Sequence, residues 1–280
     1  MRVLITGIDG FTGGYLKLKL AESGHVVTGL SANLMDFNSI EKEIEKMQPE
    51  AVVHLAGVSF AGHKEYRQYY DVNLIGTRNL LEALHCHSKN LKSVLVASSA
   101  SVYGNSYQHP INENDTPNPI NDYAISKLAL EYVAKLFMDK LPIFIVRPFN
   151  YTGVGQSENF LIPKIIKHFN RKKSSIELGN VMIQREFNDV RNVVNIYLDL
   201  LTNTPSGKIF NICTEKTFSI QDIINRCEKI TNHKMEVRVN PNFCRSNDAD
   251  RLVGNGQYLR KFINPKNEFS IDDTLFWMLS

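Results

Sequence analysis

Cysteine is scarce in this sequence, and the four that occur stand far apart. Cys86, Cys213, Cys227 and Cys244 form no C-x-x-C pair and have no histidines at ligand-like spacing. Zinc sites and secreted disulfide frameworks both need clustered cysteines. The sequence therefore argues against both kinds of site, predicts no metal, and suits a reducing cytosol.

Long apolar runs and strong net charge are also missing. No apolar run approaches the ~18 residues that a membrane span needs, and the N-terminal stretch lacks the cationic start and apolar region of a signal peptide. The net charge is only +3, and the one basic run, Arg171-Lys172-Lys173, fits a solvated helix end. We therefore expect a cytoplasmic protein that binds neither membrane nor nucleic acid.

The first fifteen residues hold the clearest positive signal. A short apolar run, 2–6, is followed by Gly7, Gly10 and Gly13 and then by a helical pattern. A strand that turns sharply into a helix leaves backbone N–H groups unpaired, which favours an anion, and glycine lets a phosphate approach closely. The spacing T-G-x-x-G-x-x-G is a shifted relative of the dinucleotide fingerprint. It predicts a phosphate-bearing ligand at this turn.

Strand-like and helix-like patterns alternate through the first half of the chain. Because the strands are apolar on both faces, the alternation predicts an α/β fold with a doubly wound parallel Rossmann sheet, covered by helices on each side. Ligands of such a sheet bind at the carboxyl ends of its strands. The predicted strands are 2–6, 25–30, 51–56, 93–97 and 143–147, and the predicted helices are 13–23, 39–47, 65–87 and 122–139.

After residue 150 the rhythm changes, with longer loops, more prolines and no strict alternation. Two capping boxes, Ser219-x-x-Asp222 and Ser270-x-x-Asp273, predict helix starts. We expect a dinucleotide-binding domain over 1–150 and a smaller mixed α/β substrate-binding lobe over 151–280, with the small-molecule site in the cleft between them.

Two polar segments follow predicted elements at the ligand side of the sheet. Asn121 or Asp122 can cap a helix on which Tyr123 and Lys127 stand one turn apart. A lysine ammonium there lowers the pKa of the tyrosine from ~10 toward the working range. The hydroxyls of 98–101 follow the strand 93–97, where one can hydrogen-bond a substrate oxygen. A surface Tyr and Lys, and a polar strand-to-loop transition, are the alternatives.

Together these motifs resemble an extended short-chain dehydrogenase/reductase from end to end. The matching residues are T-G-x-x-G-x-x-G, His54-Leu55-Ala56-Gly57, Asn73, Ser99 and Tyr123-x-x-x-Lys127. Three segments of the second half resemble the nucleotide-sugar branch of this family: Arg147-Pro148-Phe149-Asn150, Arg185-Glu186-Phe187 with Asp189-Val190, and Arg245-Ser246-x-Asp248. In that branch, arginines of this kind hold the pyrophosphate of a sugar nucleotide. Within that branch, RPFNYTGVGQ, LGN…QREFNDVRNVV and VRVNPNFCRSNDADRLVGN resemble the 4-keto-6-deoxy-sugar reductases, typified by GDP-6-deoxy-D-mannose reductase.

The resemblance implies a role for each matching residue. Ser99 would be the catalytic hydroxyl, Tyr123 the acid/base and Lys127 its partner and ribose contact, while Asn73 would support the active-site helix and its water. Asp36 would meet the adenine amino group, and 159–164 would border the base of the substrate. The residues implied to bind the cofactor are Gly7, Gly10, Phe11, Thr12, Gly13, Ser31, Asp36, Phe37, Leu55, Ala56, Gly57, Tyr123 and Lys127. Those implied to bind the substrate are Ser99, Ser101, Asn150, Arg185, Arg245 and Asp248, the arginines as bidentate phosphate donors or, alternatively, in surface ion pairs.

Three reactions share this scaffold: 4-epimerisation, 4,6-dehydration and reduction of a 4-keto sugar. Dehydratases need an acidic pair after the catalytic hydroxyl, and Ala100 and Ser101 cannot do that work. The resemblance favours reduction of a GDP- or dTDP-linked 4-keto-6-deoxyhexose to a 6-deoxyhexose for surface polysaccharide, with Tyr123 giving the proton. A 4-epimerase with tightly held NAD and a non-catalytic dinucleotide-binding regulator are the alternatives, and the product's configuration at C4 stays open.

Cofactor choice has one clue in the residues themselves. NAD-preferring sites place a carboxylate near the end of the second strand. Residues 29–33 read Gly-Leu-Ser-Ala-Asn, with neither an acid nor an arginine. The sequence therefore favours NADP(H), with NAD(H) as a second cofactor. The family often dimerises through its two long helices, here 65–87 and 122–139, so a homodimer is expected.

Overall fold

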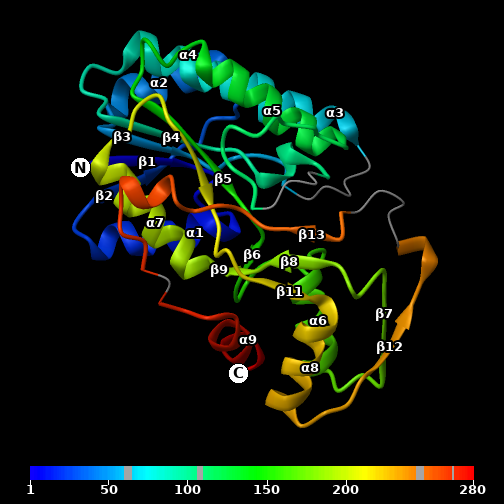
Figure 1. Cartoon of the computed structure of the whole chain (residues 1–280). Coiled ribbons are helices and arrows are strands. Elements are labelled where there is room, and N and C mark those ends of the chain that lie inside the picture. The colour runs from blue at the N-terminus through cyan, green and yellow to red at the C-terminus, as the bar shows by residue number, and fades with distance from the viewer. Residues whose placement is uncertain (60–64, 106–109, 244–248, 267) are drawn as a thin grey trace.

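A six-stranded parallel sheet forms the centre of the larger lobe of the molecule, with the strands in the order β10-β5-β4-β3-β1-β2 (Figure 1). The computed structural model describes residues 1–59, 65–105, 110–243, 249–266 and 268–280. The sheet confirms the predicted α/β doubly wound Rossmann fold. Its strands are β1 (Arg2–Thr6), β2 (Val26–Gly29), β3 (Ala51–His54), β4 (Ser93–Ala97), β5 (Ile143–Pro148) and β10 (Ile209–Ile212).

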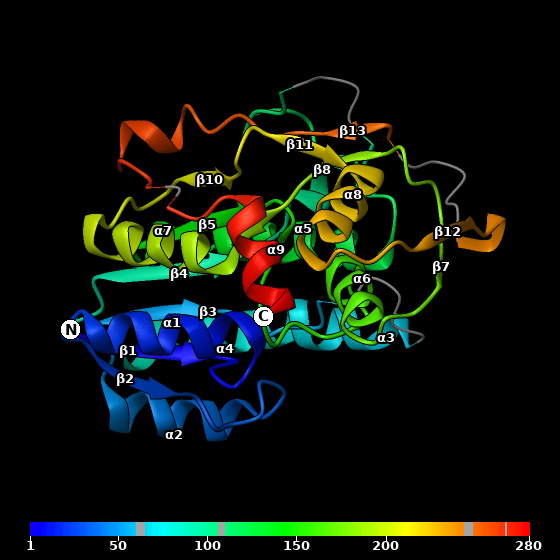
Figure 2. The same cartoon turned by 90° about the horizontal axis from the view of Figure 1, so that it is seen from below.

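Helices cover both faces of this sheet (Figures 1 and 2). Neighbouring strand residues serve opposite faces, so that Val53 packs with the helices α1 and α7 while Val52 packs with α2, α4 and α5. This two-sided burial explains why the strands are apolar without alternation. The helices are α1 (Phe11–Glu22), α2 (Phe37–Met47), α4 (Thr77–His87), α5 (Asp122–Lys135) and α7 (Val190–Asn203).

The helix predicted over 65–87 exists, but its middle is wider than an α-helix. It consists of α3 (Tyr66–Gln68), a π-helical stretch (Tyr69–Gly76) and then α4. Widened turns of this kind are frequent at functional sites. Asn73 lies in the π-helical stretch, and no residue pattern in the sequence indicated the change of pitch.

A smaller lobe is built around a second apolar cluster, to which α6, α8 and α9 all contribute. Both predicted capping boxes are confirmed: the Ser219 and Ser270 hydroxyls each accept the N–H three residues on, and the aspartate there accepts the serine N–H. The lobe's helices are α6 (Leu161–Asn170), α8 (Ile220–Thr231) and α9 (Ile271–Leu279). Its strands are β6 (Tyr151–Thr152), β7 (Ser175–Leu178), β8 (Gln184–Glu186), β9 (Asn188–Asp189), β11 (Thr217–Ser219), β12 (Glu236–Val239) and β13 (Arg251–Leu252).

The chain returns to the large sheet once after residue 150. Helix α7 packs along α1, and β10 pairs in parallel with β5 at the edge of the sheet. The apolar face of α7, including Tyr197 and Leu200, is buried in the same cluster as β1 and β3. The expected lobe of 151–280 therefore lends one helix and one strand to the dinucleotide-binding fold.

Two further expectations concern membranes and thiols. Across the described residues, every helix is too short or too polar to cross a membrane. Cys86, Cys213 and Cys227 are free thiols, whereas Cys244 lies outside the described residues.

Candidate active site

The turn between β1 and α1 has no room for side chains at its glycines. Gly7 has φ +72°, and a Cβ built on it would lie 2.9 Å from the Ala56 nitrogen; one built on Gly13 would lie 2.1 Å from the Gly7 oxygen. Helix α1 begins at Phe11, with Gly10 as its N-cap and no capping side chain. Its first N–H groups are therefore open to an anion, and the cradle fits the pyrophosphate of a dinucleotide.

The H-L-A-G segment after β3 joins this turn to the opposite side of the site. The Ala56 N–H donates to the Thr6 hydroxyl over 3.1 Å. A Cβ on Gly57 would lie 2.7 Å from Asn73 Oδ1 and 3.4 Å from Lys127 Nζ. Gly57 is thus the point at which the predicted cofactor turn and the predicted catalytic side chains converge.

The three predicted catalytic side chains come from adjoining elements. Asn121 caps α5 by accepting the Ala124 N–H over 2.9 Å, so that Tyr123 stands in the first helical turn and Lys127 in the second. Ser99 follows β4, and its Oγ lies 3.0 Å from Ser101 Oγ. Lys127 is buried, and its Nζ donates to the Ala97 carbonyl at the end of β4 over 2.9 Å. These contacts place Lys127 beside the end of β4, which Ser99 follows.

Burial dominates the ionisation of this group. It raises the pKa of Tyr123 to about 12, although the Ser99 hydrogen bond acts in the opposite direction. It also lowers the pKa of Lys127 to about 8, against the pull of the Glu131 carboxylate. The expected lowering of the tyrosine pKa by lysine is therefore wrong: burial disfavours the phenolate, and the group that acts against burial is Ser99 and not Lys127. Tyr123 is therefore protonated at neutral pH.

Asn73 fastens the π-helical stretch to α5. Its Nδ2 donates to Ser126 Oγ over 2.9 Å, and Ser126 Oγ donates to the Tyr123 carbonyl over 2.8 Å. Its Oδ1 accepts the Val58 N–H over 2.8 Å. The side chain therefore braces the first turn of α5 against the loop after β3.

Two residues of the predicted adenosine side form hydrogen bonds with or within α2. Asp36 is the N-cap of α2 and accepts from the Ser39 N–H and hydroxyl over 3.2 and 2.6 Å; Ser39 holds the pKa of Asp36 below its usual value. Ser31 donates both its N–H and its hydroxyl to Glu43 of α2, over 3.0 and 2.5 Å. Residues 29–33 contain no acid themselves, but α2 supplies a carboxylate at the end of β2. Phe37 is half-buried at the start of α2.

Arg147 is not one of the arginines that can hold substrate phosphate. It is 2% exposed, and its guanidinium forms a bidentate pair with Glu131 over 2.8 and 2.6 Å. Its third nitrogen donates to the Tyr103 hydroxyl over 2.9 Å. Sequence reasoning missed Glu131, although a carboxylate one turn beyond Lys127 and an arginine inside an apolar strand together indicate a buried pair.

The predicted substrate residues are spread along the smaller lobe and the loop after β4. Arg185, on β8, donates to the Ala249 carbonyl over 2.8 Å. Asn150 is exposed, and its carbonyl accepts the Asn188 N–H over 2.9 Å. Ser101 adjoins Ser99, as expected. Arg245 and Asp248 lie outside the described residues.

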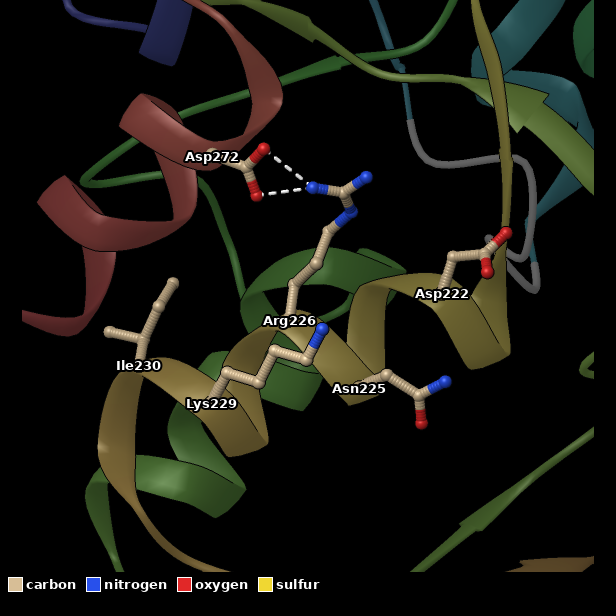
Figure 3. A pocket seen from close by; sticks show the side chains of 6 residues that line it. All are labelled: Asp222, Asn225, Arg226, Lys229, Ile230 and Asp272. Atoms are coloured by element: carbon tan, nitrogen blue, oxygen red, sulfur yellow. Dashed lines mark hydrogen bonds and ion pairs between the residues drawn. The ribbon is translucent and has the colours of Figure 1, made fainter.

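A surface pocket in the smaller lobe is separate from this group. Asp222, Asn225, Arg226, Lys229, Ile230 and Asp272 line it, and all come from α8 and α9 (Figure 3). Arg226 is already engaged by both oxygens of Asp272. No predicted site residue lines this pocket.

Comparison with known proteins agrees with this geometry. The model of the NAD dependent epimerase/dehydratase family matches residues 3–213. The GDP-6-deoxy-D-talose 4-dehydrogenase of Aggregatibacter actinomycetemcomitans is 32% identical over 275 residues, covering 96% of this chain and 94% of that protein. The GDP-6-deoxy-D-mannose reductase of Pseudomonas aeruginosa is 30% identical over 294 residues, covering 100% and 96%.

Two solved structures extend the likeness to three dimensions. The structure of RMD from Pseudomonas aeruginosa with NADPH has a TM-score of 0.91 and 28% identity, covering 99% of this chain and 97% of that one. A crystal structure from Burkholderia cenocepacia J2315 has a TM-score of 0.93 and 39% identity, covering 99% and 96%.

A Rossmann sheet that carries a glycine cradle beside Ser99, Tyr123 and Lys127 defines a nicotinamide-dinucleotide enzyme. The chain belongs to the NAD-dependent epimerase/dehydratase family, whose members modify nucleotide sugars.

Proposed function

We propose that this enzyme reduces the C4 keto group of a GDP-linked 4-keto-6-deoxyhexose, in the cytoplasm, to supply a 6-deoxyhexose for surface polysaccharide. The observation that carries the proposal is that Ser99, Tyr123 and Lys127 lie together at the end of β4. Ser99 is followed in the chain by Ala100 and Ser101, at the positions where a dehydratase needs acids. The names of the two relatives favour GDP over dTDP as the nucleotide. Because 6-deoxy-D-talose and 6-deoxy-D-mannose differ only at C4, one 4-keto sugar leads to both.

The side chains divide the work of this reduction. When bound, the dinucleotide supplies the hydride that C4 receives. The Tyr123 hydroxyl, protonated because of its raised pKa, donates its proton to the C4 oxygen. Ser99 donates a hydrogen bond to the same oxygen, and the Lys127 ammonium stabilises the phenolate that remains. Asn73 keeps the first turn of α5 in place through Ser126.

The smaller lobe would hold the nucleotide diphosphate. Arg185 is the described cation on the strand β8, and we assign it, with Arg245, to the phosphates as bidentate donors. Asn150 and Asp248 would complete the sugar side of the site, and residues 159–164 would border the base. Arg185 also donates to the Ala249 carbonyl, so phosphate binding and the placement of the neighbouring 249–252 segment are linked.

The expected homodimer has a suitable surface. On α5 and at its C-cap, the exposed Ile125, Tyr132 and Leu136 recur at intervals of seven and four, which places them on one face. The neighbouring stretch adds the exposed Ile75. We propose that this face pairs with its copy, as the two long helices of the family do.

Absorbance at the nicotinamide band, with GDP- and dTDP-linked 4-keto-6-deoxy sugars and both dinucleotides, tests the function. Tyr123→Phe is expected to lower turnover by about 10²–10⁴-fold, because it removes the proton donor. Tyr66→Phe, a matched change at an exposed tyrosine of α3, should behave like the wild type. Dinucleotide binding should persist in both variants, as followed by the fluorescence of Trp277, the sole tryptophan in the sequence.

Three results would contradict the proposal. Near-normal turnover by Tyr123→Phe would remove the assigned proton donor. Interconversion of two sugar nucleotides without net oxidation would identify a 4-epimerase. Dinucleotide binding with no oxidation by any keto sugar nucleotide would identify a regulator. NMR of the product gives its configuration at C4.

A further inference from the structure

The segment after β2 holds a carboxylate that comes from another element. Glu43 stands in the middle of α2, and its two oxygens accept separately from Ser31: Oε2 from the N–H over 3.0 Å and Oε1 from the hydroxyl over 2.5 Å. A bidentate acceptor of this kind is held in one orientation, since both donors belong to one residue. Glu43 therefore lies fixed against the end of β2.

This is the place where a Rossmann sheet meets the ribose of adenosine. Ser31 follows β2 by two residues, and β2 pairs in parallel with β1, which ends in the glycine turn. In such folds an acid about 20 residues beyond the glycines bonds the ribose 2′-hydroxyl, whereas a nearby arginine accommodates a 2′-phosphate. Ser31 occupies that position, but the carboxylate that reaches it belongs to Glu43.

The charges around Ser31 do not suit a 2′-phosphate. Residues 30–36, between β2 and α2, contain neither lysine nor arginine. The Ser31 N–H and hydroxyl, which could otherwise donate to a phosphate, already donate to Glu43. The cation of α2 nearest in sequence, Lys42, lies toward Asp36, whose pKa it helps to lower. A phosphate here would meet a negative oxygen pair and no free donor from Ser31.

We propose that Glu43 is the specificity residue that makes this enzyme prefer NAD(H) to NADP(H). Each carboxylate oxygen keeps a lone pair beyond its bond to Ser31. The adenosine ribose hydroxyls donate to these lone pairs, while a 2′-phosphate is repelled. The preference arises from local residues, because the Pseudomonas structure with NADPH shows that the fold accepts the phosphorylated dinucleotide.

The inference rests on the dinucleotide part of the proposed function and not on the identity of the sugar. Binding is therefore measured without substrate, by titrating NADH and NADPH against the fluorescence of Trp277. That residue is 5.9 Å from Tyr15 of α1, the helix that begins at the glycine turn. Failure of sugar reduction leaves this titration intact, and loss of selectivity leaves the reductase assay intact.

Glu43→Gln is the informative variant, because it removes the charge and retains an oxygen that can accept from Ser31. The wild type is expected to bind NADH more tightly than NADPH by at least about tenfold, the size of one unscreened charge contact of ~1.4 kcal/mol. In Glu43→Gln the affinity for NADPH should rise by a similar factor, while that for NADH falls or stays level. Glu45→Gln makes the same charge change at an exposed position of α2 and should retain the wild-type ratio.

Two outcomes would overturn the assignment. A wild type that prefers NADPH would show that Glu43 leaves room for the phosphate. Equal NADH-to-NADPH ratios in Glu43→Gln and Glu45→Gln would show that the effect of net charge, and not the contact with Ser31, sets the preference.

Discussion

Arg147 and Arg185 belong to segments that resemble phosphate-binding motifs, yet we expect their replacement by methionine to affect different properties: stability for Arg147 and substrate binding for Arg185. Arg147 lies inside the fold and serves stability, whereas Arg185 lies at the proposed phosphate site and serves binding. In Arg147→Met, Glu131 keeps its charge, is 0% exposed, and loses both guanidinium hydrogen bonds. Breaking one side of a buried ion pair costs about 3–5 kcal/mol.

The size of the expected shift follows from that cost. At roughly 2–4 °C per kcal/mol in a chain of this length, the Tm of Arg147→Met should fall on the order of 10 °C. The double variant Glu131→Leu with Arg147→Met removes both charges of the pair and should recover part of the loss, because neither partner is left as an unpaired buried charge. Arg185→Met should lose no more than about 1.5 kcal/mol, the scale of one or two hydrogen bonds.

Thermal denaturation by circular dichroism and steady-state kinetics separate the two residues. Arg185→Met should raise KM for the sugar nucleotide by roughly 10–100-fold, since a charge-assisted hydrogen bond contributes about 1.5–3 kcal/mol. Arg147→Met should leave KM nearly unchanged at a temperature where it is folded. The reasoning is refuted if Arg147→Met keeps the wild-type Tm and raises KM.

Two further predictions concern proton transfer and assembly. The kcat/KM for reduction should fall as pH rises through about 8, because the pKa of Lys127 is lowered to about 8 and its ammonium is lost above that value. Steady-state kinetics across the pH range test this role. It is contradicted if kcat/KM stays level up to pH 10, or if the pH profile of Lys127→Met has the same shape as that of the wild type. Leu136→Glu, at the exposed C-cap of α5, should halve the mass measured by sedimentation equilibrium, whereas Leu18→Glu, at a similarly exposed leucine of α1, should not.

Much of the fold could be predicted from local pattern. Strands buried on both faces, such as β3 and β5, are recognisable because they contain mostly apolar residues. The capping boxes that begin at Ser219 and Ser270 are four residues long and mark where their helices start. The pairing of β10 with the large sheet could not be predicted from local pattern. Its partner, β5, ends some 60 residues earlier in the chain, and the pairing depends on α7 finding α1, which no local pattern contains.

The site divides in the same way between local and long-range signals. Gly7, Tyr123 and Lys127 belong to short motifs that are recognised by their spacing. In the structure, Gly7 lies against Ala56, and the neighbouring Gly57 lies against Lys127 Nζ. Glu43 and Glu131 act on Ser31 and Arg147 from 12 and 16 residues away. Residues 29–33 contain no acid, yet Glu43 of the neighbouring helix bonds to Ser31, so a motif read along the chain does not show every side chain that reaches its position.

A single hydrogen-bond chain explains why the separate motifs depend on one another. The His54 ring bridges Thr6, over 2.7 Å, and Thr77, over 2.9 Å, and burial lowers its pKa to about 3, so it is neutral. Thr77 already donates its hydroxyl proton to the Asn73 carbonyl, so His54 Nε2 must be the donor to Thr77 and Nδ1 the acceptor from Thr6. Thr6 in turn accepts from the Ala56 N–H. Each hydrogen bond of this series thus has one direction, and the series fastens the glycine turn through Asn73 to the helix that carries Tyr123. It therefore holds the glycine cradle and the proposed proton donor in a fixed relation.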